Sequence, residues 1–245
     1  MTVSAAAILA HLNAVDAERR GRAALPELNA KVVAVKQYQQ RRFAHTYADL
    51  LLSPRYGAAA RYFLDELYGP ADFSRRDDQF ARVAPTLVRL FPNDLAETVA
   101  ALAELHALSE ALDSAMGAAL TSDRIEGGDY IRAWRAVGRP TDRARQIELT
   151  LGIAARLDRV TRLPLLRRSL GLMRGPARAA GLAELQRALE AGFDTFKKMK
   201  GAQDFIAIIA AREKDFAAAL FSSALAGGAD AAAAMERAIA GLPPG

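Results

Sequence analysis

The chain of 245 residues contains no cysteine, three histidines, one tryptophan and only 7% aromatic residues. Without cysteine it has no disulfide, no thiolate metal site and no thiol nucleophile. Long apolar runs are also missing, because the longest uncharged stretches, 2–15 and 216–229, are shorter than the ~20 residues that a membrane-spanning helix needs. The first residues lack a basic leader. We therefore expect a cytoplasmic protein without a transmembrane segment.

Several catalytic motifs are missing as well. The chain has no Gly-x-x-x-x-Gly-Lys nucleotide loop, no Gly-x-Ser-x-Gly elbow and no His-Glu-x-x-His zinc motif. Di-iron helical bundles use a repeated Glu-x-x-His motif, whereas Glu104 lies only two residues before His106 and the pair occurs once. We thus expect no catalytic residue, no metal and no cofactor.

Positive charge is concentrated in the second half of the chain. Residues 1–120 hold 13 basic and 14 acidic residues, which gives −1, and residues 121–245 hold 20 and 14, which gives +6. No aromatic platform accompanies the basic residues, so we expect no sequence-specific nucleic-acid binding. Ordinary solvated helix faces, in a sequence that uses Arg more than Lys, are the favoured interpretation of the basic residues. A contact with a protein partner or, weakly, with an anionic surface is the alternative. The basic face comprises Arg156, Arg159, Arg162, Arg167, Arg168 and Arg174.

Helix-forming residues dominate the chain, and Pro and Gly mark the breaks between helical segments. The sequence predicts an all-α fold, either a single multi-helix bundle of about ten helices or two lobes that meet near 121–128. We divide it into an N-terminal helix (1–24), a helical bundle domain (25–222) and a short Ala-rich helix with a flexible tail (223–245). Helices are expected over 4–20, 26–52, 54–68, 74–91, 94–120, 127–137, 141–160, 163–174, 178–199, 202–222 and 229–240.

His106 is the most unusual polar residue of the predicted helices. On a helical wheel it falls within the apolar face of the 94–120 helix, beside Val99 and Leu102. Glu110 follows one turn later and can accept a hydrogen bond from the imidazole ring. We expect His106 to be a buried structural residue, and a ligand or general base is the alternative.

The segment 55–77 is the richest in aromatic residues, and it contains a recognisable heptapeptide. Residues 62–68 resemble the signature of an uncharacterised bacterial family named for its FFLEELY motif, with two conservative departures, at Tyr62 and Asp65. The resemblance implies a shared fold and no particular activity. From the residue types alone we expect a structural role, because such spacings of Tyr and Phe are typical of a core. The motif consists of Tyr62, Phe63, Leu64, Asp65, Glu66, Leu67 and Tyr68.

The missing catalytic motifs, the apolar content and the basic second half favour a non-catalytic binding or assembly module, with a protein partner or self-association. The alternative is a haem- or cofactor-binding protein that is loosely similar to globins. In that hypothesis Leu102 lies one turn before the ligand His106, with Phe63 or Phe73 upstream in the haem pocket.

Overall fold

The computed structural model describes residues 4–67, 78–83, 93–163, 165–222 and 239–243, and throughout these residues the chain is all-α, as predicted. A helical turn also covers 78–83. The labelled elements are α1 (Ala5–Ala23), α2 (Pro26–Thr46), α3 (Ala48–Leu52), α4 (Gly57–Tyr62), the π-helical turn η1 (Phe63–Leu67), α6 (Asn93–Ala119), α7 (Gly127–Val137), α8 (Pro140–Val160), α9 (Leu166–Leu172), α10 (Arg174–Ala179), α11 (Ala183–Lys198) and α12 (Gln203–Ser222).

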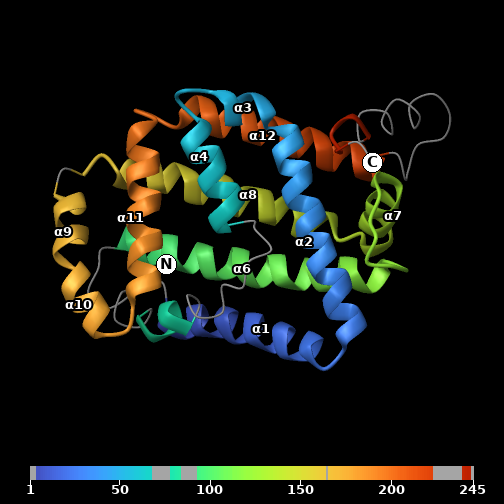
Figure 1. Cartoon of the computed structure of the whole chain (residues 1–245), viewed down its shortest axis with the longest axis horizontal. Helices are drawn as coiled ribbons and strands as arrows, with labels where there is room; N and C mark the ends of the chain where they lie inside the picture. The colour runs from blue at the N-terminus through green and yellow to red at the C-terminus, as the bar shows by residue number, and fades with distance from the viewer. Residues whose placement is uncertain (1–3, 68–77, 84–92, 164, 223–238, 244–245) are drawn as a thin grey trace.

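Four long helices, α1, α6, α8 and α12, lie side by side in that spatial order (Figure 1). The 27 residues of α6 extend over about 40 Å, and this helix contacts α1, α2, α7 and α8. Helices α2, α4 and α11 cross the layer, and α9 and α10 lie at one end of it (Figure 1). Among the described residues, no helix is both long and apolar enough to cross a membrane.

Three groups of buried apolar side chains hold the helices together. The first joins α2, α6, α7 and α12, the second joins α3, α4, α8, α11 and α12, and the third joins α1 to α6 and the turn at 78–83. The first two groups meet at the pocket described below, because both contribute side chains to its wall. Prominent members are Tyr130 and Trp134 in the first group, Phe196 and Phe205 in the second, and Ile8 and Val99 in the third.

Local signals fix several helix starts. The Ser4 hydroxyl accepts a hydrogen bond from a backbone N–H of the first turn of α1, and Pro26 and Pro140 begin α2 and α8. Between α7 and α8 the chain turns through Gly138 and Arg139, which have φ angles of 63° and 58°. Glycine readily adopts the positive φ angle at Gly138, whereas at Arg139 the left-handed conformation is one that residues with a side chain rarely adopt. The turn lets α8 fold back beside α6.

Two of the expected helices are wrong in their bounds near the pocket. The predicted helix 26–52 is interrupted at Tyr47, which adopts a non-helical backbone conformation between α2 and α3. The predicted helix 54–68 begins only at Gly57, because the Ser53 hydroxyl accepts hydrogen bonds from the N–H groups of Arg55 and Tyr56 and stabilises a turn instead. From Phe63 the helix continues with π-helical winding.

The segment 163–199 also differs from its prediction. The expected helix 163–174 is the shorter α9, and a further short helix, α10, spans the expected break at 175–177. The expected helix 178–199 begins only at Ala183, after Gly181 with a φ angle of 69°. The helices expected over 74–91 and 229–240 lie largely outside the described residues.

Candidate ligand-binding pocket

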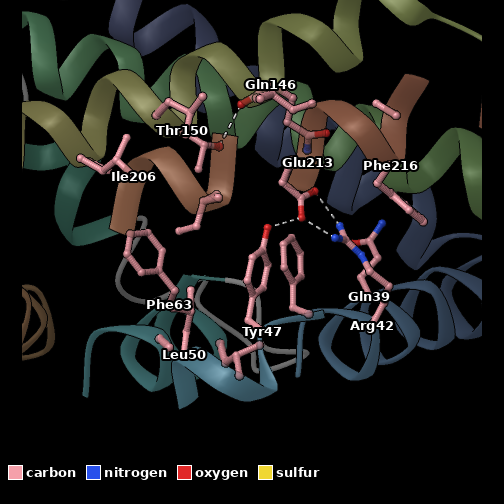
Figure 2. A pocket seen from close by; sticks show the side chains of 18 of the residues that line it. Gln39, Arg42, Tyr47, Leu50, Phe63, Gln146, Thr150, Ile206, Glu213 and Phe216 are labelled. Atoms are coloured by element: carbon pink, nitrogen blue, oxygen red, sulfur yellow. Dashed lines mark hydrogen bonds and ion pairs between the residues drawn. The ribbon is translucent and has the colours of Figure 1, made fainter. Parts of the chain in front are cut away.

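A pocket lies among α2, α3, α4, η1, α7, α8 and α12, and we call it the arginine pocket (Figure 2). Its cavity volume is about 90 Å³. Its wall consists of Gln39, Arg42, Phe43, Tyr47, Leu50, Ala60, Phe63, Leu64, Tyr130, Trp134, Arg143, Gln146, Ile147, Thr150, Leu151, Ala154, Phe205, Ile206, Ile209, Glu213, Phe216 and Ala217.

Helical periodicity explains why these residues share one cavity. The wall residues of α8 recur every three or four positions from 143 to 154, and those of α12 recur in the same way from 205 to 217. Residues with this spacing lie on one face of a helix. On α8 the stripe mixes polar with apolar side chains, in the order Arg143, Gln146, Ile147, Thr150, Leu151 and Ala154.

The two ends of the arginine pocket differ in polarity. Figure 2 shows Phe63, Leu50 and Ile206 at one end of the cavity. Gln39 and Arg42 lie at the other end, with Glu213 between the two groups. The pocket therefore has an apolar body and a polar head, which is typical of small-molecule sites.

Arg42 and Glu213 form a neutralised pair in the wall. The Arg42 Nη2 donates to Glu213 Oε2 at 2.9 Å, the Nη1 donates to Oε1, and the Tyr47 hydroxyl donates to Oε1 at 2.6 Å. The guanidinium lies between the rings of Phe43 and Phe216, 3.9 and 4.7 Å from their centroids. Burial by itself lowers the pKa of Arg42, but the charge and hydrogen bonds of Glu213 outweigh it and raise that pKa. Both charges of this pair are thus matched inside the protein.

Arg143 is buried without such a partner. It is 3% exposed, its guanidinium lies 3.9 Å from the centre of the Trp134 ring, and its Nη1 donates to Gln146 Oε1 at 3.2 Å. Among the described residues, no acceptor meets its Nε or Nη2, and no carboxylate lies within ion-pair distance. A buried guanidinium normally uses its donors in hydrogen bonds, so these two nitrogens are an exception that calls for an explanation.

The electrostatic surroundings of Arg143 do not replace a partner. Burial, as the largest cause, lowers the pKa of Arg143, and the nearby cation Arg42 lowers it further, whereas Tyr130 and Asp113 act in the opposite sense. Asp113 is itself buried, with its pKa raised chiefly by burial, and its Oδ1 accepts a hydrogen bond from Gln39 at 3.1 Å. The head of the arginine pocket therefore keeps an excess of positive charge.

The motif residues reach this pocket only in part. Phe63 and Leu64 line it, while Asp65 is exposed and the Tyr62 hydroxyl donates to the Ala188 carbonyl at 3.1 Å. The side chains of Glu66 and Leu67, and the whole of Tyr68, lie outside the described part of the structure. The carbonyl of Leu64 accepts a hydrogen bond from Gln40 of α2 at 3.3 Å, which ties the π-helical turn to the pocket wall. Such turns occur frequently at functional sites.

His106 belongs to a different polar cluster, between α1, α2 and α6. Its Nε2 lies 3.6 Å from Glu110 Oε1, so the expected carboxylate neighbour is correct, and 3.2 Å from Arg19 Nη2. The side chain is 27% exposed, so the expectation of a buried histidine is wrong. The reason is that α6 has helices on several sides, and His106 lies at the edge of its contact with α1.

Glu110 is the centre of this second cluster. It is 3% exposed and pairs with Arg22, with Lys36 Nζ at 2.7 Å and with Arg19 Nη2 at 3.4 Å. Burial alone raises the pKa of Glu110, but the hydrogen bond with His106 and the charges of Lys36 and Arg22 lower it far below its usual range. The cluster thus joins three helices through one ionised carboxylate.

The haem-binding alternative receives no support from this arrangement. Phe63 lines the arginine pocket, whereas His106 contacts Glu110 and Arg19, and Phe73 lies outside the described residues. Among the described residues, no group of three or more His, Asp or Glu side chains is placed to hold a metal ion.

The basic face is distributed between ion pairs and solvent, and within the described part of the chain none of its six arginines lines the pocket. Arg159 and Arg168 are exposed. The other four form ion pairs on the protein itself, namely Arg156–Glu97 at 3.3 Å, Arg162–Asp158 at 2.6 Å, Arg167–Asp194 at 2.7 Å and Arg174–Glu190 at 2.8 Å. Most of the positive charge in this stretch is therefore already matched.

Sequence reasoning missed Arg143, although a signal was present. Arg143, Gln146 and Thr150 fall on the same helical face as Ile147 and Leu151, so that a cation interrupts an apolar stripe. The predicted basic face covers only arginines between 156 and 174, so it does not include Arg143.

The profile of one protein family, described as "Domain of unknown function (DUF8198)", matches residues 18–226. No curated protein and no solved structure matches the chain. The matched range includes every residue of the arginine pocket and of the Glu110 cluster. The chain therefore belongs to the family of this domain of unknown function.

Proposed function

We propose that the protein is a non-catalytic binding module that holds one small molecule in the arginine pocket. The observation that carries this proposal is a cavity with an apolar body and a buried polar head, built by helices that are distant in the sequence. Sites for small molecules combine these features.

The chemistry of the wall supports binding more than catalysis. Glu213 is the one carboxylate that lines the described part of the pocket, and its two oxygens already accept hydrogen bonds from Arg42 and Tyr47. A general base needs a carboxylate oxygen that is available to a substrate proton. The wall therefore offers positioning groups and apolar contacts.

Replacing Thr150 with Phe is expected to block ligand binding, because the larger side chain fills the cavity from α8. The probes are hexanoate and its neutral analogue hexanamide, at millimolar concentrations. Trp134, the only tryptophan of the chain, lines the pocket, so its fluorescence emission reports occupancy. We expect a saturable change in the parent protein with at least one probe, and affinity at least about tenfold weaker in Thr150→Phe.

The matched control is Ala144→Phe, which adds the same ring at an exposed position of the same helix. This variant should bind like the parent. The proposal is wrong if neither probe changes the Trp134 emission of the parent, or if Thr150→Phe binds as tightly as Ala144→Phe.

We also propose that the protein self-associates through exposed apolar side chains at the end of the molecule formed by α9 and α10. Three apolar side chains there are largely exposed: Leu165 (67%), Leu172 (80%) and Met173 (52%). Exposure of such groups is unfavourable, because the transfer of apolar surface out of water lowers the free energy. Such exposed groups mark interaction surfaces when they occur together.

The double variant Leu165→Glu, Leu172→Glu is expected to sediment as a monomer under conditions in which the parent sediments as an oligomer. Its thermal midpoint should change little, because both side chains are exposed. Leu52→Glu is the control, since Leu52 is 85% exposed but lies at the end of α3. Equal sedimentation of the parent and the double variant contradicts this surface.

We infer further that the FFLEELY-like residues 62–68 are a signature of the matched family and that the family is bacterial. The segment lies within the matched range, and two of its side chains, Phe63 and Leu64, belong to the pocket wall.

A further inference from the structure

We propose that the ligand of the arginine pocket is a small apolar monocarboxylate, with its carboxylate bound by Arg143 and its apolar part directed toward Phe63 and Ile206. This inference rests on the proposed binding function and specifies the chemical class of the ligand.

The side chains that line the described part of the wall carry one more positive than negative group. Arg42, Arg143 and Glu213 are the ionic side chains that line the described part of the pocket, and Glu213 is engaged by Arg42. An unmatched buried cation costs several kcal/mol of desolvation, and an anion bound beside it offsets that cost. A ligand with one acidic group restores neutrality at the head of the pocket.

The position of Arg143 in its helix also favours a bound anion. It lies in the first turn of α8, where the helix macrodipole is positive and where a cation is disfavoured. Helix N-termini favour anions for the same reason. The helix and the guanidinium therefore act on a bound carboxylate in the same direction.

The geometry of the guanidinium suits a carboxylate. Its plane is held over the ring of Trp134, and Gln146 occupies Nη1. The two nitrogens without a partner among the described residues, Nε and Nη2, are neighbours on one edge of the guanidinium, and such an edge binds the two oxygens of a carboxylate in parallel. Both nitrogens are covered by side chains in the structure, so the ligand head reaches them when neighbouring groups such as Gln146 shift.

The rest of the pocket limits the ligand to one acidic group and a short apolar part. The end opposite Arg42 holds the apolar side chains of Leu50, Phe63 and Ile206, with the hydroxyl of Thr150 nearby, and it offers no charged group to stabilise a second charge (Figure 2). The cavity volume of about 90 Å³ is small, which favours a short apolar part such as that of hexanoate.

The test compares hexanoate, hexanamide and the diacid adipate by calorimetry and by Trp134 emission. The parent should bind hexanoate at least about tenfold more tightly than either of the others. Arg143→Met should abolish this preference, and Arg143→Lys should retain only part of it, because a lysine ammonium lacks the paired donors of the guanidinium edge. In the absence of ligand, Arg143→Met should melt at the same temperature as the parent or higher, since it removes an unmatched buried charge.

Each unexpected result would refute a different proposal. If hexanoate and hexanamide bind equally and Thr150→Phe still blocks both, the acidic ligand class is wrong and the binding function stands. If neither compound binds the parent, both proposals are wrong. If Arg143→Met melts well below the parent and leaves the hexanoate preference unchanged, Arg143 is a structural partner of Asp113, and the assignment of the carboxylate to Arg143 is overturned.

Discussion

Replacing Glu110 with Gln is expected to lower the free energy of unfolding by about 3–5 kcal/mol, because it leaves Arg22 buried beside a neutral amide. The Arg22 side chain is 6% exposed, and its Nη2 loses the carboxylate of Glu110. Its Nη1 keeps Ser114 Oγ, at 2.7 Å, as an acceptor. That remaining bond stabilises the orientation of Arg22 but supplies no counter-charge.

Urea titrations of the parent and Glu110→Gln measure this difference. Asp16→Asn is the matched control on α1, because Asp16 forms an ion pair with Arg20 that is exposed to solvent on both sides. Exposed pairs of this kind contribute little, so the control should change stability by less than about 0.5 kcal/mol. Similar losses in both variants would show that burial of the Glu110 cluster has no special energetic role.

The same variant should change the pH dependence of stability. The pKa of Glu110 is lowered in the folded protein: burial opposes the shift, and the hydrogen bond with His106 and the charges of Lys36 and Arg22 overcome it. A carboxyl with a lowered folded pKa stabilises the protein above its unfolded pKa of about 4.3, and this contribution is lost as the pH falls toward the folded pKa. The stability difference between the parent and Glu110→Gln should therefore be constant near neutral pH and narrow below about pH 5.

Replacing Glu213 with Gln is expected to have an effect of similar size, about 3–5 kcal/mol, in the wall of the arginine pocket. Arg42 is 4% exposed, and the substitution leaves its charge between two aromatic rings without a carboxylate. With Arg143 nearby, the pocket then holds two unmatched guanidinium groups. Thermal and denaturant unfolding should both report the loss.

Two further variants separate charge from hydrogen bonding at this position. Tyr47→Phe removes one hydrogen bond to Glu213 and should cost only about 1–2 kcal/mol. The double variant Arg42→Met, Glu213→Gln removes the unmatched cation and should recover most of the stability that Glu213→Gln loses. If the double variant is less stable than Glu213→Gln, the unmatched charge of Arg42 is not the main cause of the loss in Glu213→Gln, and the long Arg42 stem itself stabilises the protein through packing.

The helical class and many helix starts follow from local signals in the sequence. Ser4, Pro26 and Pro140 act within their own first turns, so their effect can be predicted without knowledge of the fold. The break at Tyr47 has no such local cause. Its hydroxyl donates a hydrogen bond to Glu213, which lies 166 residues later in the chain. A contact between residues so far apart produces no periodic pattern in the sequence.

The polar clusters show a second limit of sequence reasoning. A helical wheel identifies His106 and Arg143 as polar residues within apolar stripes, but it does not say what covers each stripe. The face with His106 meets the Arg19 and Glu110 side chains and is partly open to solvent. The face with Arg143 closes over a cavity. The difference between these two helix faces comes from the packing of α7 and α12 against α8 and α2, which the helical wheel does not contain.

The separation of Arg42 and Glu213 by 171 residues has a consequence during synthesis of the chain. At about 5–20 residues per second, a ribosome needs roughly 10–35 s between making the arginine and making its carboxylate. Throughout that interval Arg42 has no Glu213 to pair with, and the polar head of the pocket lacks its wall from α12. Arg42 can therefore pair with Glu213 only after α12 has left the exit tunnel, and α12 is the last of the described pocket helices to be made.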